Sequence, residues 1–163
     1  MRIWDVRPTS FRDRVGSYLG RAPAAQEPIH ELMTAPGKDV RAVAFSIDGS
    51  ALAAAGDDGV VRIWDLVAID GLSKALADNR DAPALTFAGK DSVAFSPDGR
   101  FIAATDGEGL VHVHDRRTGL LSAALESPAP PMRPKLLQIR FLPDGRPAAL
   151  DSNGWIAIWP AIA

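Results

Sequence analysis

The chain has 163 residues, of which 18 are basic, 20 are acidic and none is cysteine. This length favours one domain or part of one, and a net charge of −2 leaves no overall field that would attract nucleic acid. The lack of cysteine excludes a disulfide framework and a thiolate nucleophile and suits the cytoplasm, while the absence of a long apolar run argues against a membrane partner.

The chain begins with a strand-like run at residues 1–6, followed by an insertion at residues 7–27 that shows little periodicity. Residues 1–26 hold five arginines against two aspartates. Aromatic and basic side chains alternate in the insertion: Phe11, Arg12, Arg14 and Tyr18. The simpler interpretation is a solvated loop whose aromatic rings pack back on a sheet. The alternative is a recognition loop, because rigid aromatics beside arginine are common in binding hot spots.

Residues 40–66 are predicted to form an antiparallel meander of three strands. The strand-forming runs at 41–46, 51–55 and 60–65 are separated by two turns that contain Asp-Gly. Asp-Gly between apolar runs is a strong hairpin signal, because both residues tolerate the positive φ of tight turns. Outer strands are predicted at 29–33 and 84–88. A meander alone buries too little surface to be stable, so neighbouring sheets are expected.

A second insertion, residues 67–80, has a different character. Ile69, Leu72 and Leu76 fall at helical spacing, and Asp70 stands where it could cap the start of a helix. We therefore predict a short amphipathic helix whose apolar stripe lies on the sheet. A docking site for a partner protein is the alternative use of that stripe.

The meander recurs twice further along the chain, at residues 91–115 and 136–160. Two anchor positions recur in all three copies: Phe45, Phe95 and Phe141 at the first, and Trp64, His114 and Trp159 at the second. The first anchor repeats after 50 and 46 residues, and the second after 50 and 45 residues. Such a period with about four strands per unit is typical of a β-propeller. The motif FSxDG followed by DDGxVRIWD closely resembles the WD-repeat family over nearly the whole chain.

The resemblance implies an all-β fold, an open arc of four-stranded antiparallel blades from a WD-repeat β-propeller. Residues 1–34 would supply the third and outer strands of a truncated blade, and 35–88 and 89–126 two further blades. A last blade, 127–163, would lack its outer strand. Thirteen strands are too few for a closed ring. We therefore expect the missing blades to be supplied in cis or in trans, or the chain to self-associate.

In this family a histidine, a serine or threonine, an aspartate and a tryptophan often form one hydrogen-bond network in a blade. The residues that match the later members of this pattern are Asp58, Trp64, Asp65, His114, Asp115, Asn153 and Trp159. Lys38 and Lys90 stand at the histidine position, Ala54 at the serine or threonine position and Glu108 at the second aspartate position. The network is thus degenerate, and we expect packing to carry more of the stability.

The sequence carries little catalytic chemistry. His112 and His114 alternate on one predicted strand, but the chain has only one further histidine, so a structural role is favoured over a metal site. Turn chemistry accounts for the many aspartates beside glycine. No phosphate-binding glycine loop, nucleophile elbow or zinc-ligand spacing occurs. We expect no cofactor, no metal and no enzyme.

Three functions then compete. The favoured one is a non-catalytic protein–protein interaction scaffold, because WD-repeat domains generally bind proteins. A fragment of a propeller enzyme is the second. The third is a structural element that completes the propeller of another chain.

The two insertions provide a hypothesis for the binding surface. Successive connections in a blade alternate between its two faces, and both insertions follow a third strand. They should therefore be neighbours on one face, beside the turn at residues 48–49. Because binding residues concentrate on loops held by a rigid scaffold, we expect a composite protein-binding surface there that prefers an acidic partner. Two solvated, dispensable loops are the alternative.

Overall fold

The computed structural model describes residues 2–3, 30–31, 35–66, 83–127 and 134–162. They belong to two compact units, Met1–Met33 and Thr34–Ala163. In the first unit, strand β1 (Arg2–Ile3) pairs antiparallel with β2 (His30–Glu31). The insertion at residues 7–27 and the helix predicted at 67–80 both lie outside the described residues.

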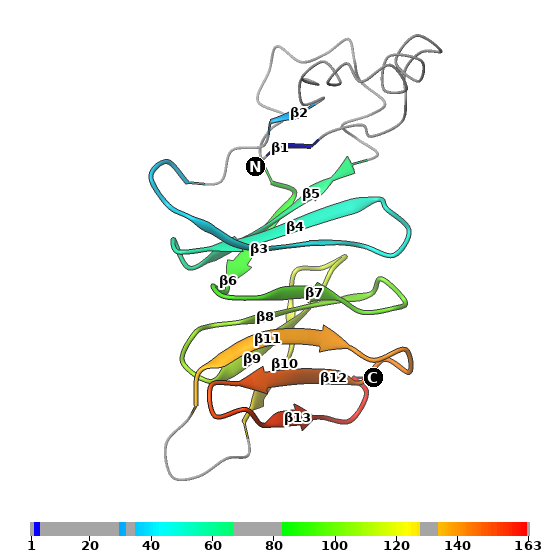
Figure 1. Ribbon diagram of the computed structural model, residues 1–163. Coiled ribbons are helices and arrows are strands. Elements are labelled where there is room, and N and C mark those ends of the chain that lie inside the picture. Colours follow the sequence, from blue (N-terminus) through cyan, green and yellow to red (C-terminus); the bar gives the residue numbers. More distant parts are fainter. Residues whose placement is uncertain (1, 4–29, 32–34, 67–82, 128–133, 163) are drawn as a thin grey trace, which may run out of the picture. The chain divides into compact units, whose positions relative to one another are not determined.

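The second unit contains three antiparallel sheets, which lie face to face in the order of the sequence (Figure 1). The first sheet consists of β3 (Val40–Phe45), β4 (Ala51–Gly56), β5 (Val60–Asp65) and β6 (Leu85–Ala88). The second consists of β7 (Val93–Phe95), β8 (Phe101–Thr105), β9 (Leu110–Asp115) and β10 (Leu121–Glu126). The third consists of β11 (Leu136–Phe141), β12 (Pro147–Asp151) and β13 (Ile156–Ile158). The predicted all-β fold of four-stranded antiparallel sheets is confirmed.

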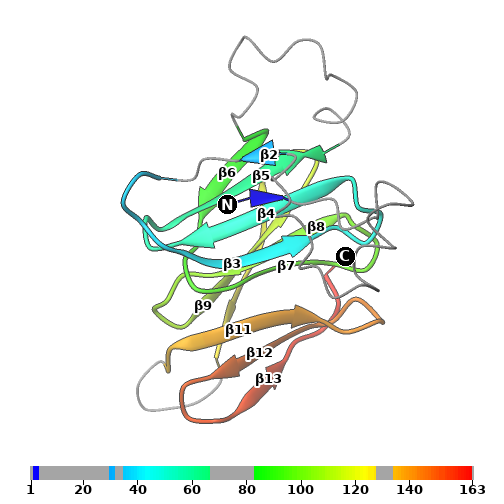
Figure 2. The ribbon, with the colours of Figure 1, turned by 45° about the horizontal axis from the view of Figure 1, so that its top comes forward.

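The first strands of the three sheets, β3, β7 and β11, lie next to one another (Figure 2). Each sheet then runs outward from this strand in chain order, so strands that follow one another in the sequence are neighbours in the sheet. The connections between the first three strands of each sheet follow from the sequence, because short turns separate these apolar runs.

The turn after the first strand is closed by the same device in the first two sheets. The Ser46 hydroxyl donates to Asp48 Oδ1 over 2.6 Å and accepts the backbone N–H of Ala51 over 2.9 Å. Gly49 follows with a φ of 69°, a conformation that residues with a Cβ rarely adopt. The Ser46 hydroxyl, followed by the N–H and hydroxyl groups of Ser50, holds the pKa of Asp48 below its usual range. The turn therefore contains an ionised carboxylate.

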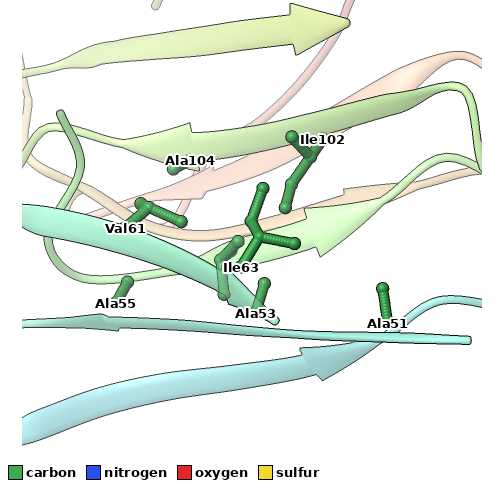
Figure 3. Close-up of a cluster of buried hydrophobic side chains, with 8 residues drawn as sticks. Ala51, Ala53, Ala55, Val61, Ile63, Ile102 and Ala104 are labelled. Atoms are coloured by element: carbon green, nitrogen blue, oxygen red, sulfur yellow. The ribbon is translucent and has the colours of Figure 1, made fainter. Parts of the chain in front are cut away.

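Small and β-branched side chains form the contact between the first and second sheets (Figure 3). Alternate residues of β4 and β5 point toward the second sheet: Ala51, Ala53, Ala55, Val61 and Ile63. They meet Val93, Ile102 and Ala104, and every member of this cluster is at most 3% exposed. Alternation of this kind follows from the two-residue period of a strand. A second cluster joins the second sheet to Leu136, Ile139 and Ala149 of the third.

Gly89, just after β6, shows how closely the first two sheets approach. A Cβ at this position would lie 2.6 Å from Val61 Cγ2 and 2.7 Å from Ala104 Cβ. Because neither neighbour can retreat from a packed interface, this contact requires glycine. Among the described residues, no helix is long and apolar enough to cross a membrane.

Candidate functional site

The turns after the first strands and the loop after β9 share one face of the second unit. In the first two sheets, a backbone hydrogen bond joins the residue after the third strand to the turn after the first strand: Leu66 N–H donates to Ser50 O, and Arg116 N–H donates to Arg100 O, each over 2.8 Å. We call this surface the arginine face and define it by the turns 46–50, 96–100 and 142–146 and the loop 116–120. This alternation of connections is what the sequence predicts for an antiparallel meander.

Two adjoining hollows lie on the arginine face. The first, of about 600 Å³, is lined by Gly99, Arg100, Asp115, Arg116 and Arg117. The second, of about 340 Å³, is lined in part by Trp64, Leu85 and Thr118, and it shares Arg116 and Arg117 with the first. The lining of the larger hollow thus combines three arginines with one aspartate.

Two of these arginines are held in place by aromatic rings and polar groups. The guanidinium carbon of Arg100 lies 4.6 Å from the centre of the Phe101 ring, and its Nε lies 3.7 Å from Asp115 Oδ2. Arg116 lies 5.7 Å from the centre of the Phe95 ring and donates from Nη2 to Ser50 Oγ over 2.9 Å. Ser50 belongs to the first sheet, so this bond ties the first two sheets together at the hollow.

Asp115 organises the loop that carries Arg117. Its Oδ1 accepts the N–H groups of Thr118 and Arg117 over 2.9 and 3.0 Å, and the Thr118 hydroxyl over 3.1 Å. These bonds, that of the Thr118 N–H first, lower the pKa of Asp115. An ionised Asp115 balances one of the three arginines, so the larger hollow keeps an excess of positive charge.

The residues that the sequence proposed for partner binding, Phe11, Arg12, Arg14, Tyr18, Ile69, Leu72 and Leu76, lie outside the described residues. Their composite surface therefore stays a prediction. Sequence reasoning missed Arg100, Arg116 and Arg117. The signal was present, since Arg100 follows an Asp-Gly turn and Arg116-Arg117 follow a third strand. Both connections were expected on the same face.

In the second and third sheets, the residue at the recurring tryptophan position contacts the preceding sheet. The His114 ring stacks on Phe87 of β6, with ring centres 4.1 Å apart, and its Nδ1 lies 3.0 Å from Gly119 O. Trp159 donates from Nε1 to the backbone oxygen of Glu126, in β10, over 3.2 Å. Trp64, in the first sheet, is only 1% exposed. His114 thus stands at a tryptophan position but makes contacts of its own, with Phe87 and Gly119.

An aspartate accepts backbone N–H groups in the turn before the third strand of each sheet, but its position within the turn differs between the sheets. Asp58 Oδ1 accepts the N–H of Val60 over 3.2 Å, and its other oxygen pairs with Arg62. In the second sheet Asp106, rather than Glu108, accepts the N–H of Leu110 over 3.1 Å. Asp65, which was also singled out, is exposed.

The third sheet uses Asp151 for the same purpose. This side chain is 3% exposed, and its Oδ1 accepts the N–H groups of Asn153 and Trp155 over 2.8 and 2.9 Å. Asn153 itself is exposed and contributes its backbone N–H. The carboxylate that satisfies this turn therefore lies two residues before the asparagine that the sequence pattern selected.

Replacing Asp151 with alanine is expected to lower the free energy of unfolding by about 1–3 kcal/mol, because two N–H groups lose a charged acceptor. Asn153→Ala is the matched control and should change it by less than about 0.5 kcal/mol. Urea unfolding followed by tryptophan fluorescence measures both. Equal effects of the two substitutions would show that Asp151 has no special role in the turn.

No cluster of three or more histidine, cysteine, aspartate or glutamate side chains that could hold a metal occurs in the described ranges. The two histidines of β9 are engaged separately. His112 Nε2 lies 3.8 Å from Asp106 Oδ2, and His114 stacks on Phe87. The geometry of this strand provides packing and turn contacts rather than a ligand set.

Comparison with known proteins agrees with this architecture. The family model of the WD domain, G-beta repeat (WD40), matches residues 26–65 and 86–115. Periodic tryptophan protein 2 of Arabidopsis thaliana is 29% identical over 152 residues. That alignment covers 93% of this chain and 13% of the relative, so the chain spans only a small part of that protein.

Three solved structures share the fold. A chain of a mitotic checkpoint complex matches 78% of this chain with a TM-score of 0.61 and 19% identity, over 36% of its own length. The structure of U3-55K matches 79% with a TM-score of 0.61 and 12% identity, over 38% of its length. The β-propeller domain of Myceliophteria thermophila Cps50 (Swd1) matches 80% with a TM-score of 0.56 and 18% identity, over 42% of its length. Together with the three stacked meanders, these matches show that the chain has the fold of part of a β-propeller, with WD40-type repeats at the two matched stretches.

Proposed function

We propose that the chain is a non-catalytic protein-interaction scaffold whose arginine face binds an acidic segment of a partner protein. WD-repeat propellers are typically protein-interaction scaffolds. The observation that carries the proposal is the hollow lined by three arginines, Arg100, Arg116 and Arg117, and one acidic residue, Asp115.

The way the arginines are held supports this role. Guanidinium groups bind carboxylates through two parallel hydrogen bonds, and arginine is enriched where proteins bind one another. Stacking on Phe101 and Phe95 restrains Arg100 and Arg116 before any partner arrives. A restrained side chain loses less conformational entropy on binding, which strengthens the interaction.

The charges around the hollow favour a peptide over a nucleic acid. Asp48, Asp98, Asp115 and Asp144 lie on the same face, and hydrogen bonds lower the pKa of each. A continuous phosphate backbone would meet these ionised carboxylates as well as the arginines. A short acidic segment can place its few charges on the arginines alone.

The same pKa directions argue for binding rather than catalysis. A general acid at neutral pH needs a carboxyl group whose pKa is raised by burial or by a like charge. Every carboxyl group with a clear shift among the described residues is shifted downward, by hydrogen bonds in a turn or by an ion pair. Such groups keep their negative charge and shape the surface.

A fluorescein-labelled octaglutamate peptide is the probe for this proposal. The full chain should raise its fluorescence anisotropy, and added salt should weaken the effect because the contact is electrostatic. Arg100→Glu combined with Arg117→Glu should weaken binding by roughly tenfold or more. Arg116 is left intact because it also bonds Ser50.

The matched control is Lys38→Glu combined with Lys90→Glu. It makes the same change in net charge in the segments that precede β3 and β7, on the opposite face. Its affinity for the peptide should stay within about twofold of the original chain. An equal loss in both variants would mean that net charge alone governs binding. Tighter binding of a single-stranded DNA oligonucleotide than of the peptide would contradict the proposal.

A further inference from the structure

The repeat position that carries tryptophan in the first and third sheets carries His114 in the second, and its ring nitrogen makes a different contact from that of Trp159. Trp159 donates from Nε1 to the backbone oxygen of Glu126, in the outer strand of the preceding sheet. His114 Nδ1 lies 3.0 Å from Gly119 O, in the loop that follows its own strand. Because a carbonyl oxygen only accepts, Nδ1 carries the proton in this bond. His114 thus donates to the loop of the arginine face.

The His114 ring also packs against the first sheet. It stacks on Phe87 of β6, with ring centres 4.1 Å apart and an angle of 20° between the ring planes. Stacked rings of this kind contribute to stability beyond the surface that they bury. The imidazole therefore makes two contacts that can be separated by substitution: its flat face packs on the first sheet, and its Nδ1 edge bonds the loop.

Gly119 is the point at which the end of this loop is held. Its φ is 74°, and a Cβ at this position would lie 2.5 Å from Leu85 Cδ1, so the loop backbone lies directly against β6. A positive φ together with such a close approach requires glycine. The N–H of Gly119 donates to Asp115 O over 2.8 Å, and its oxygen accepts the His114 bond. Both backbone polar groups of Gly119 are thus hydrogen-bonded.

Two arginines of the larger hollow, Arg116 and Arg117, lie between the two fixed ends of this loop. At the first end, Asp115 Oδ1 accepts the N–H of Arg117 over 3.0 Å. At the second end, His114 bonds Gly119. Unlike Arg116, the exposed Arg117 side chain has no ring contact or hydrogen bond within the described part of the chain. Its place at the hollow therefore depends on how the loop backbone is held.

We propose that His114 is a positioning residue for the arginine face. Its bond to Gly119 holds the loop so that Arg117 stays at the hollow, ready to bind an acidic segment. This role rests on the proposed function, because the loop serves that binding. It also accounts for the departure from tryptophan at this repeat position. An indole has a single donor, Nε1, and in the third sheet that donor bonds the preceding sheet instead of the loop.

Two substitutions in the full chain separate the donor from the ring. His114→Phe keeps a ring that can stack on Phe87 and removes the donor. Its thermal midpoint should stay near that of the original chain, because water can reach the half-buried Gly119. Its affinity for the fluorescein-labelled octaglutamate peptide should fall by about three- to tenfold, the effect of one lost hydrogen bond. His114→Asn keeps an N–H donor at the place of Nδ1 and removes the ring. Its midpoint should fall, whereas its affinity, measured well below that midpoint, should stay within about twofold of the original.

Hydrogen exchange of the loop amides, followed by mass spectrometry, tests the positioning without any ligand. The amides of residues 116–119 should exchange about threefold faster or more in His114→Phe than in the original chain, because the loop opens more often. In His114→Asn they should exchange at nearly the original rate. A residue that only packs between the sheets would give the opposite order, since the asparagine variant would then open more readily.

His112→Phe is the matched control, because it makes the same change on the same strand, where the imidazole lies 3.8 Å from Asp106 and away from the loop. It should leave the peptide affinity within about twofold and the loop exchange unchanged. Equal affinities of the original chain and His114→Phe would overturn the role of His114. So would affinities that fall in step with the thermal midpoints of the two His114 variants. If the original chain does not bind the peptide, the proposed function fails, and the exchange rates alone then decide whether His114 orders the loop.

Discussion

Replacing Trp64 with alanine is expected to lower the free energy of unfolding by about 3–5 kcal/mol. The side chain is 1% exposed, and its cross-strand neighbour Leu52 is buried to the same extent. Removing the indole therefore leaves a cavity that the surrounding strands cannot close fully. Urea denaturation followed by far-ultraviolet circular dichroism measures the change without relying on tryptophan emission.

Trp155→Ala is the control for that substitution, because Trp155 is 71% exposed. Its effect should stay within about 0.5 kcal/mol, which is usual for surface positions. Comparing the two variants distinguishes the effect of losing a buried indole from the effect of losing any tryptophan. If Trp64→Ala were as mild as Trp155→Ala, the recurring tryptophan would not contribute to stability through burial.

Ile63→Asp is expected to destabilise the chain by at least about 4 kcal/mol, through lost apolar packing and a buried carboxyl group without a partner. Ile63 is 3% exposed between the first and second sheets, among alanine, valine and isoleucine side chains. The soluble yield and the thermal midpoint should both fall sharply. A folded variant with an unchanged midpoint would contradict the packing described between these sheets.

Ile158→Asp makes the same substitution at the repeat-equivalent position of the third sheet. Ile158 is 52% exposed, so the new carboxylate stays hydrated and the fold should survive with a change below about 1 kcal/mol. The two variants thus test one sequence position in two environments. The expected contrast comes from the neighbouring sheet alone.

The stacked sheets and the arginine face depend on each other. Arg116 reaches Ser50 across the contact between the first and second sheets, and Phe95 lies beneath its guanidinium. A substitution that separates these sheets should therefore also disperse the arginines. Stability and peptide binding should be measured together on each variant, so that a loss of binding is not assigned to the arginines when the sheets have moved.

Much of the fold follows from local sequence. Strand runs separated by Asp-Gly turns predicted the hairpins, and the described strands lie at the predicted runs. The spacing of the phenylalanine and tryptophan anchors predicted the repetition of the sheet. These features are readable because turn geometry and side-chain alternation depend on residues only a few positions apart.

Other features depend on residues that are distant in the chain. Arg100 and Arg116 lie close together because the turn after β7 and the loop after β9 are hydrogen-bonded to each other. Ser50 of the first sheet then bonds the Arg116 side chain. The choice of Asp151 over Asn153 depends on which oxygen reaches the turn N–H groups. The sequence places the turn and the loop on one face, but the bond to Ser50 and the choice of Asp151 are not visible in a pattern of residue types.

The contrast between Ile63 and Ile158 shows most clearly which properties depend on the tertiary structure and not on the local sequence. The sequence alone determined that both are β-branched residues on the third strand of a repeat, and it predicted the same face for each. Only the tertiary structure decided that Ile63 is buried and Ile158 exposed. The physical reason is that burial depends on whether another sheet lies on that face, and the strand itself does not encode its neighbour.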